Sequence, residues 1–194
     1  MGYDRERIQG GLDVNKKIRY IAETAVMLAL LVTLQAVTKP AGQLITGSAV
    51  NTVLAMAALV GGLGCGLTVA LLSPLLAFAL KIAPNILVVP AIMLGNAVFV
   101  ALLWAIADRS GKHLVRQAVA WMSAAAAKFA LMYAIVAWLI CGLLASRLMM
   151  SGVLKAPMLK ALPATFGWPQ LVTALIGGAL ALLMAPMVRK ALKK

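Results

Sequence analysis

No charged residue occurs between Pro40 and Leu80, and this stretch limits what the chain can fold into more than any other part of it. About 20 apolar residues cross the hydrocarbon core of a bilayer, so the stretch is too long for one span. The whole chain follows the same trend, with 63% hydrophobic residues, 12% charged residues and a mean hydropathy of +0.99. Soluble domains are typically about 45–50% apolar and about 25% charged. We therefore predict an all-α integral membrane protein.

The boundaries of the apolar stretches predict six transmembrane helices. The glycine-rich run from Gly61 to Gly66 divides the uncharged stretch and favours a turn there. Residues 1–17 are polar, and no small-residue cleavage site follows the first apolar stretch, so we expect that stretch to remain as a span. One domain of residues 1–194 would then contain helices over about Ile18–Val37, Ala49–Val60, Leu67–Leu80, Ile86–Ala107, Leu114–Ser146 and Gln170–Val188. The second and third of these are short, and one span with a re-entrant segment is the alternative.

The distribution of basic residues predicts the orientation. With both termini on one side, that side holds twelve of the eighteen lysines and arginines. The other side holds five, which are Lys39, Lys81, Arg147, Lys155 and Lys160. The positive-inside rule therefore predicts cytoplasmic termini. The predicted outer loops contain no carboxylate, and an outer face with only basic groups would attract an anion.

Several function classes are disfavoured by missing motifs. The chain has no phosphate-binding loop of the G-x-x-x-x-G-K-[ST] type and no H-E-x-x-H motif, and its single histidine, His113, falls in a basic loop. Cys65 and Cys141 have no metal-type spacing, so we expect free cysteines. The net charge of +13 flanks apolar spans, which indicates a bilayer and not nucleic acid as the partner. We predict no catalytic residues, no metal and no cofactor.

Lys128 interrupts the apolar run from Ser123 to Ile140. A charge at the centre of a bilayer costs about 2.5–3.5 kcal/mol on insertion scales, and intramembrane charges usually mark a substrate path. Lys128 comes twelve residues after Arg116, which is roughly 18 Å along a helix. Three roles are open at this point: contact with a bound anion, hydrogen bonds to backbone carbonyls or Asn side chains, and snorkelling to the interface.

Other polar and aromatic residues could share a cavity with Lys128. The candidates for substrate contact are Lys128, Asn96, Gln170, Asn51, Gln43, Tyr133 and Trp168. Each amide could equally bond a neighbouring helix. Trp168, next to a loop, could instead be an interfacial anchor.

The first predicted helix carries small side chains at helical spacing. Ala22, Ala25 and Ala29 begin a stripe that continues through Thr33 and Ala36. Small residues let another helix approach closely in a membrane. The stripe could serve a partner protein or packing within the chain.

Together these features resemble the substrate-binding S component of energy-coupling factor (ECF) vitamin transporters. The run Ala25–Ala29, "AVMLA", matches that family's Ala-x-x-x-Ala motif in the expected helix. The resemblance implies six helices with both termini in the cytoplasm of a prokaryote, in its plasma membrane. It also implies a pocket built largely from helices 4 to 6 and closed by the first outer loop, here the segment around Gln43 to Ser48.

The resemblance further implies a mechanism without covalent chemistry. The S component captures a scarce nutrient outside and docks by the alanine stripe on a transmembrane coupling subunit driven by two ATPases. Lys128 would pair with an anionic group of the substrate, while Asn96 and Gln170 would orient it. We expect a carboxylate-bearing vitamin or precursor, such as lipoate, niacin or pantothenate. The rival hypotheses are a stand-alone secondary carrier of a small organic anion and a membrane enzyme or assembly subunit.

Overall fold

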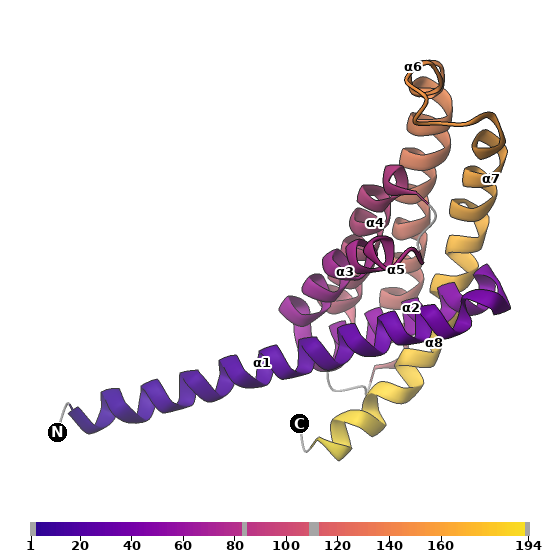
Figure 1. Cartoon of the computed structure of the whole chain (residues 1–194). Helices are drawn as coiled ribbons and strands as arrows, with labels where there is room; N and C mark the ends of the chain where they lie inside the picture. Colours follow the sequence, from indigo (N-terminus) through magenta and orange to yellow (C-terminus); the bar gives the residue numbers. More distant parts are fainter. Residues whose placement is uncertain (1–2, 83–84, 109–112, 193–194) are drawn as a thin grey trace.

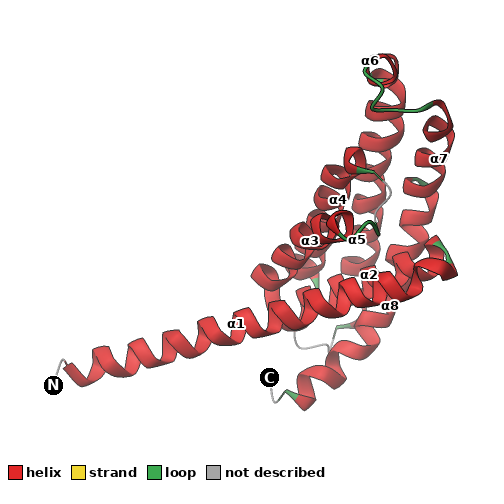
Figure 2. Cartoon of the chain, viewed as in Figure 1, coloured by secondary structure: helices red, strands yellow, loops and turns green. Residues whose placement is uncertain are grey.

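The computed structural model describes residues 3–82, 85–108 and 113–192, with side chains from Asn15 onward. The described residues form helices joined by short turns, and no strand occurs among them (Figure 2). In chain order the elements are α1 (Tyr3–Thr38), η1 (Lys39–Ala41), α2 (Gln43–Met56), η2 (Ala57–Gly61), α3 (Gly62–Ala79), η3 (Ile86–Val88), α4 (Val89–Ile106), α5 (Leu114–Tyr133), η4 (Ala134–Leu143), α6 (Ala145–Met150), α7 (Ala156–Phe166) and α8 (Trp168–Ala191). The elements η2 and η4 are π-helical.

The helices suit a membrane. Within the described residues, five helical segments are long and apolar enough to cross one: Asn15–Ala41, Gln43–Ala79, Ile86–Ile106, Leu114–Leu143 and Ala156–Ala191. Large apolar side chains are exposed along these segments, among them Val26, Leu94 and Leu183. In water such surfaces would associate, whereas lipid accepts them. The chain is therefore a membrane-embedded, multi-pass, all-helical protein.

The longest helix is α1, which runs obliquely across the other helices and extends well beyond them at its N-terminus (Figure 1). It starts at Tyr3, far ahead of the predicted Ile18, because the polar N-terminal segment continues the same helix. Glu23 accepts a hydrogen bond from Arg19 Nε at 2.9 Å, one helical turn away. On the side facing the bundle, Leu31 is fully buried in the core.

The chain turns back within the glycine-rich run, as predicted, but the break is narrower than Gly61 to Gly66. The helix breaks at Gly62 alone, whose φ of 89° favours glycine. Gly64 and Gly66 lie inside α3, where a Cβ on Gly64 would meet the Tyr20 ring at 3.2 Å. These two glycines therefore serve close packing. The segment Gln43–Ala79 is an apolar pair of helices, α2 and α3, with a sharp break between them.

The first outer connection is also more helical than predicted. We expected a loop around Gln43 to Ser48, but α2 begins at Gln43, directly after the short η1. The connection before α8 is likewise helical: Pro157 occupies the first turn of α7, a position that proline tolerates, and Pro163 lies inside that helix. The predicted fifth helix continues as π-helix to Leu143. Beyond it, α6 lies at one end of the molecule, and α7 runs back alongside η4 toward α8 (Figure 1).

Two groups of contacts define opposite ends of the helix bundle. At one end, called the Lys39 end, Lys39 Nζ donates to the Lys81 carbonyl at 3.1 Å, so α2 begins where α3 stops. At the other, called the Arg189 end, Arg189 donates from Nε to the Leu59 carbonyl at 3.1 Å. Arg116 Nε donates to the Ile106 carbonyl at 2.6 Å and links the start of α5 to the end of α4. The chain thus runs from one end to the other through α2 and returns through α3.

The main helix contact is between α2 and α8. A Cβ on Gly177 would approach both Asn51 Cβ and the Ser48 carbonyl oxygen at 2.6 Å. Nothing larger than glycine fits there, so the two backbones lie in direct contact. This contact sets the position of Asn51 in the interior.

Candidate functional site

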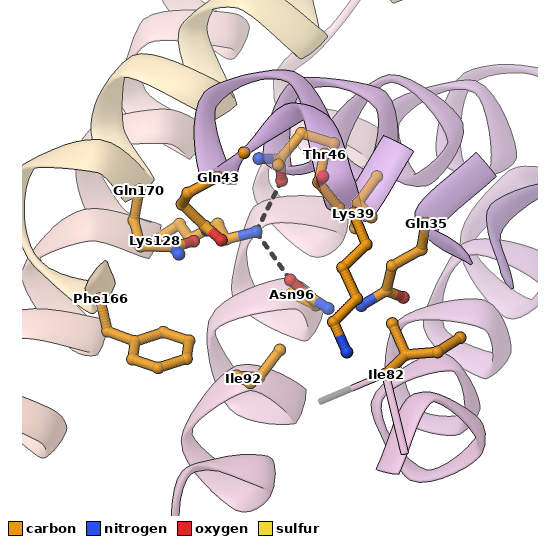
Figure 3. Close-up of a pocket in the computed structure, with 14 residues that line it drawn as sticks. Gln35, Lys39, Gln43, Thr46, Ile82, Ile92, Asn96, Lys128, Phe166 and Gln170 are labelled. Atoms are coloured by element: carbon orange, nitrogen blue, oxygen red, sulfur yellow. Dashed lines mark hydrogen bonds between the residues drawn. The ribbon is translucent and has the colours of Figure 1, made fainter. Parts of the chain in front are cut away.

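Lys128 is buried at the centre of the bundle, with only 2% of its surface exposed. Its Nζ donates to Asn51 Oδ1 at 2.6 Å and to Asn96 Oδ1 at 2.7 Å, as the dashed lines in Figure 3 show. The ammonium also lies 5.5 Å from the centroid of the Phe99 ring, within the range of a cation–π contact. These contacts hold Lys128 in the interior, so it does not snorkel. The hydrogen bonds to Asn side chains were one of the three roles open from the sequence.

A second layer of hydrogen bonds orients Asn51. Its Nδ2 donates to Thr173 Oγ1 at 3.2 Å, and the Thr173 hydroxyl donates to the Gln170 carbonyl at 3.3 Å. Thr173 is fully buried. Because its hydroxyl accepts from the Asn51 NH₂ group, the carbonyl oxygen of Asn51 faces Lys128. Helices α2, α4, α5 and α8 thus contribute to one polar network.

A cavity of about 270 Å³ lies against this network. Its walls come from the end of α1, from η1, from Ile82 in the turn after α3, and from α2, α4, α5, α7 and α8. The lining residues are Gln35, Lys39, Gly42, Gln43, Thr46, Gly47, Val50, Asn51, Ile82, Ile92, Asn96, Lys128, Phe166 and Gln170. They include two lysines and five amides, and none of these described lining residues carries a carboxylate. Such a lining suits a small anion with further polar groups.

Five of the seven predicted contact residues line this cavity: Gln43, Asn51, Asn96, Lys128 and Gln170. Figure 3 places Lys128 and Gln170 on one side and Lys39 and Gln35 on the other. The resemblance predicted walls mainly from helices 4 to 6. In the structure a large share of the cavity wall comes from α2, because the segment that we expected to be a loop forms the first turns of this helix.

Tyr133 and Trp168 do not reach the cavity. Trp168 is 66% exposed and Tyr133 is 52% exposed. Both rings contact Phe129 on the outside of α5, with centroid distances of 6.1 Å from Trp168 and 6.0 Å from Tyr133. The prediction that Tyr133 and Trp168 form aromatic walls of the cavity is therefore wrong, because both side chains face away from the bundle. Phe166, from α7, supplies the aromatic wall of the cavity instead.

Sequence reasoning did not propose Gln35, Lys39 or Thr173 for the site. Gln35 and Lys39 lie at the end of α1 and in η1, and only the path of the chain brings them to the cavity that Lys128 lines. Thr173 carried a weak signal, because it follows Gln170 by three residues and therefore shares its helix face. Thr173 touches Asn51 and not the cavity, so it acts as a positioning residue.

The small-residue stripe of α1 is free of the bundle. Ala22, Ala25, Ala29, Thr33 and Ala36 are all exposed. Packing within the chain, one of the two explanations open from the sequence, therefore does not account for the stripe.

Comparisons of the chain with protein-family models, with curated proteins and with solved structures find no match. The chemistry of the cavity therefore carries the functional conclusion. Ammonium and amide groups bind an anion by charge-assisted and neutral hydrogen bonds. Within the described residues, no group of three or more His, Cys, Asp and Glu side chains is placed to hold a metal ion.

Replacing Thr173 by valine tests the positioning of Asn51. Valine keeps the shape but removes the hydroxyl, so the buried Asn51 NH₂ loses its acceptor, at a cost of about 1–3 kcal/mol. We expect the thermal midpoint to fall and the fraction of protein that retains a small molecule in native mass spectrometry to drop several-fold.

Thr52→Val is the matched control. Thr52 is the neighbour of Asn51, and its hydroxyl donates only to the Ser48 carbonyl of its own helix, at 2.8 Å. Its loss should leave ligand retention unchanged. Equal retention by the two variants would show that Thr173 does not position Asn51.

Proposed function

We propose that this protein is the substrate-capture subunit of an ECF-type importer for a small organic anion. One observation carries the proposal: a buried lysine, Lys128, at a cavity in which neutral amides are its only described hydrogen-bond partners. Removing a charge from water is costly unless a counter-charge or hydrogen bonds compensate. An anionic ligand supplies the counter-charge. The expected class is a carboxylate-bearing vitamin or precursor, such as lipoate, niacin or pantothenate.

The proposed topology has six crossings with both termini in the cytoplasm. The return of the chain through α3 supports counting α2 and α3 as two crossings. Lys16, Arg116 and Arg189 belong to the side richer in basic residues, and the contacts of Arg116 and Arg189 define the Arg189 end. Six of the twelve basic residues on that side (Arg5, Arg7, Arg109, Lys112, Lys193 and Lys194) have side chains outside the described part of the chain. By the positive-inside rule the Arg189 end faces the cytoplasm, so the cavity, at the Lys39 end, faces the outside.

The exposed stripe of small residues on α1 supports the proposal that this helix binds a partner protein. Ala22, Ala25 and Ala29 form a surface that another helix can approach closely. In the proposed mechanism this surface docks on a transmembrane coupling subunit driven by two ATPases. The protein itself performs no covalent chemistry; it binds the substrate from outside and is moved by its partners.

Co-purification from the native membrane tests the proposal. A tagged chain should bring down a coupling subunit and two ATPases, and uptake in proteoliposomes should require ATP and those partners. A retained small anion should appear in native mass spectrometry of the purified chain. Uptake driven by an ion gradient, with the chain alone in the vesicle, would instead identify a stand-alone secondary carrier.

A further inference from the structure

Lys39 is the second cation of the cavity and lies at its exposed rim. A lysine at such a rim normally extends into water. Here its ammonium donates to the Lys81 carbonyl at 3.1 Å. Lys81 lies two residues after the end of α3 in a left-handed conformation with φ of 56°, and the adjacent amide of Ile82 donates to the Ala77 carbonyl at 2.8 Å. The turn after α3 therefore presents a carbonyl that holds the Lys39 ammonium at the rim of the cavity.

Neither cavity lysine has a carboxylate partner among the described side chains. Lys128 donates to two neutral amide oxygens and Lys39 to one neutral carbonyl, while an ammonium has three donors. Of the described acidic residues, Glu23 pairs with Arg19, and Asp108 accepts from the backbone of His113. The cavity thus contains two positive charges, one at the buried side and one at the rim, with donors still available on each.

We propose that the ligand of this cavity is a small organic dicarboxylate, with one carboxylate at Lys128 and the other at Lys39. This inference rests on the proposed capture function and changes the expected substrate class, because lipoate, niacin and pantothenate each carry only one carboxylate. A monocarboxylate would match only one of the two charges. The two lysines come from different elements of the cavity wall, Lys128 from α5 and Lys39 from η1. Gln35 and Gln43 line the cavity with Lys39 and supply further amide donors for the second carboxylate.

Binding of chain-length-matched acids to the purified full-length protein tests the inference. The probes are straight-chain dicarboxylates from succinate to azelate, and the monocarboxylates with the same number of carbons. They are measured by thermal shift and isothermal titration in detergent at low ionic strength. We expect at least one dicarboxylate to bind about tenfold more tightly than its monocarboxylate, the ratio that one charge-assisted hydrogen bond gives.

Two lysine variants assign the second carboxylate. Lys39→Gln should lower the affinity of that dicarboxylate about tenfold and leave the monocarboxylate unchanged, so that the two affinities become equal. Lys81→Gln is the matched control: it removes the same charge at the same end, but the Lys81 side chain does not line the cavity and its carbonyl remains. We expect the ratio in that variant to equal the ratio in the wild type.

The outcomes separate this inference from the proposed function. Monocarboxylates that bind as tightly as the dicarboxylates, and depend on Lys128, would overturn the dicarboxylate class and leave anion capture standing. A ratio that survives Lys39→Gln, or falls equally in Lys81→Gln, would overturn the role of Lys39. If no acid of either series binds the wild type, the dicarboxylate inference is wrong; ATP-dependent uptake and co-purified ATPases would still decide the capture function.

Discussion

Replacing Lys128 by methionine is expected to abolish ligand binding while the protein still inserts and folds. Methionine fills nearly the same volume but leaves the ligand's anionic group buried beside neutral atoms. Removing one partner of a buried charge pair costs about 3–5 kcal/mol, which corresponds to a loss in affinity of more than two orders of magnitude. Native mass spectrometry should therefore find the purified variant without the small molecule that the wild type retains.

The stability of Lys128→Met follows from two opposing terms. The variant no longer buries an ammonium, which favours folding, whereas Asn51 and Asn96 lose the donor to their oxygens. Both amides line the cavity, where water can replace the lost donor. We expect a thermal midpoint close to that of the wild type. Lys160→Met, at an exposed position of α7, is the control and should retain the ligand. Normal binding by Lys128→Met would make the lysine purely structural.

Replacing Ala25 and Ala29 together by tryptophan is expected to stop transport and leave substrate binding unchanged. Both positions are exposed on α1, away from the cavity, so indole rings there disturb neither the bundle nor the ligand. They do prevent a partner helix from approaching a stripe of small residues. ATP-dependent uptake in proteoliposomes that contain the coupling subunit and the ATPases should fall to background, and titration of the isolated variant should give the wild-type affinity.

Val26→Trp with Leu30→Trp is the matched control for the alanine stripe. These two residues are also exposed on α1 and four positions apart, but they already carry large side chains. Their replacement changes the surface without filling a small-residue groove, so we expect uptake to continue. Normal transport by the Ala25 and Ala29 double variant would exclude the docking role and favour a carrier that works alone.

Much of the fold could be predicted because the membrane imposes it. In lipid every backbone polar group needs an internal partner, so long apolar stretches become helices. The helices α4 and α8 follow the predicted spans closely. The predicted helix boundaries were wrong where the local composition is typical of turns. Gly64 and Gly66 lie within a helix, and so does the segment that begins at Gln43. A glycine in a membrane helix serves close packing as readily as it serves a turn, and only the neighbouring helix decides between the two.

The candidate site was predictable in part. Lys128, Asn51 and Asn96 could be selected because polar groups are rare and costly in apolar spans. Their pairing could not, since these residues lie on three different helices. Trp168 shows the opposite case, because an aromatic residue near a loop fits a pocket and a lipid interface equally well by sequence, and only its exposure separates them.

By itself, the sequence determined that the chain lies in a lipid bilayer, which stretches form helices, and that one charge is buried. Each of these depends on the free energy of moving local groups from water into lipid. The tertiary structure decided what surrounds that charge. The contact of α2 with α8 at Gly177 places Asn51 next to Lys128, and the return of α3 brings Lys81 to Lys39. These contacts join residues distant along the chain, and they follow from how closely helix backbones can pack, which a local pattern does not record.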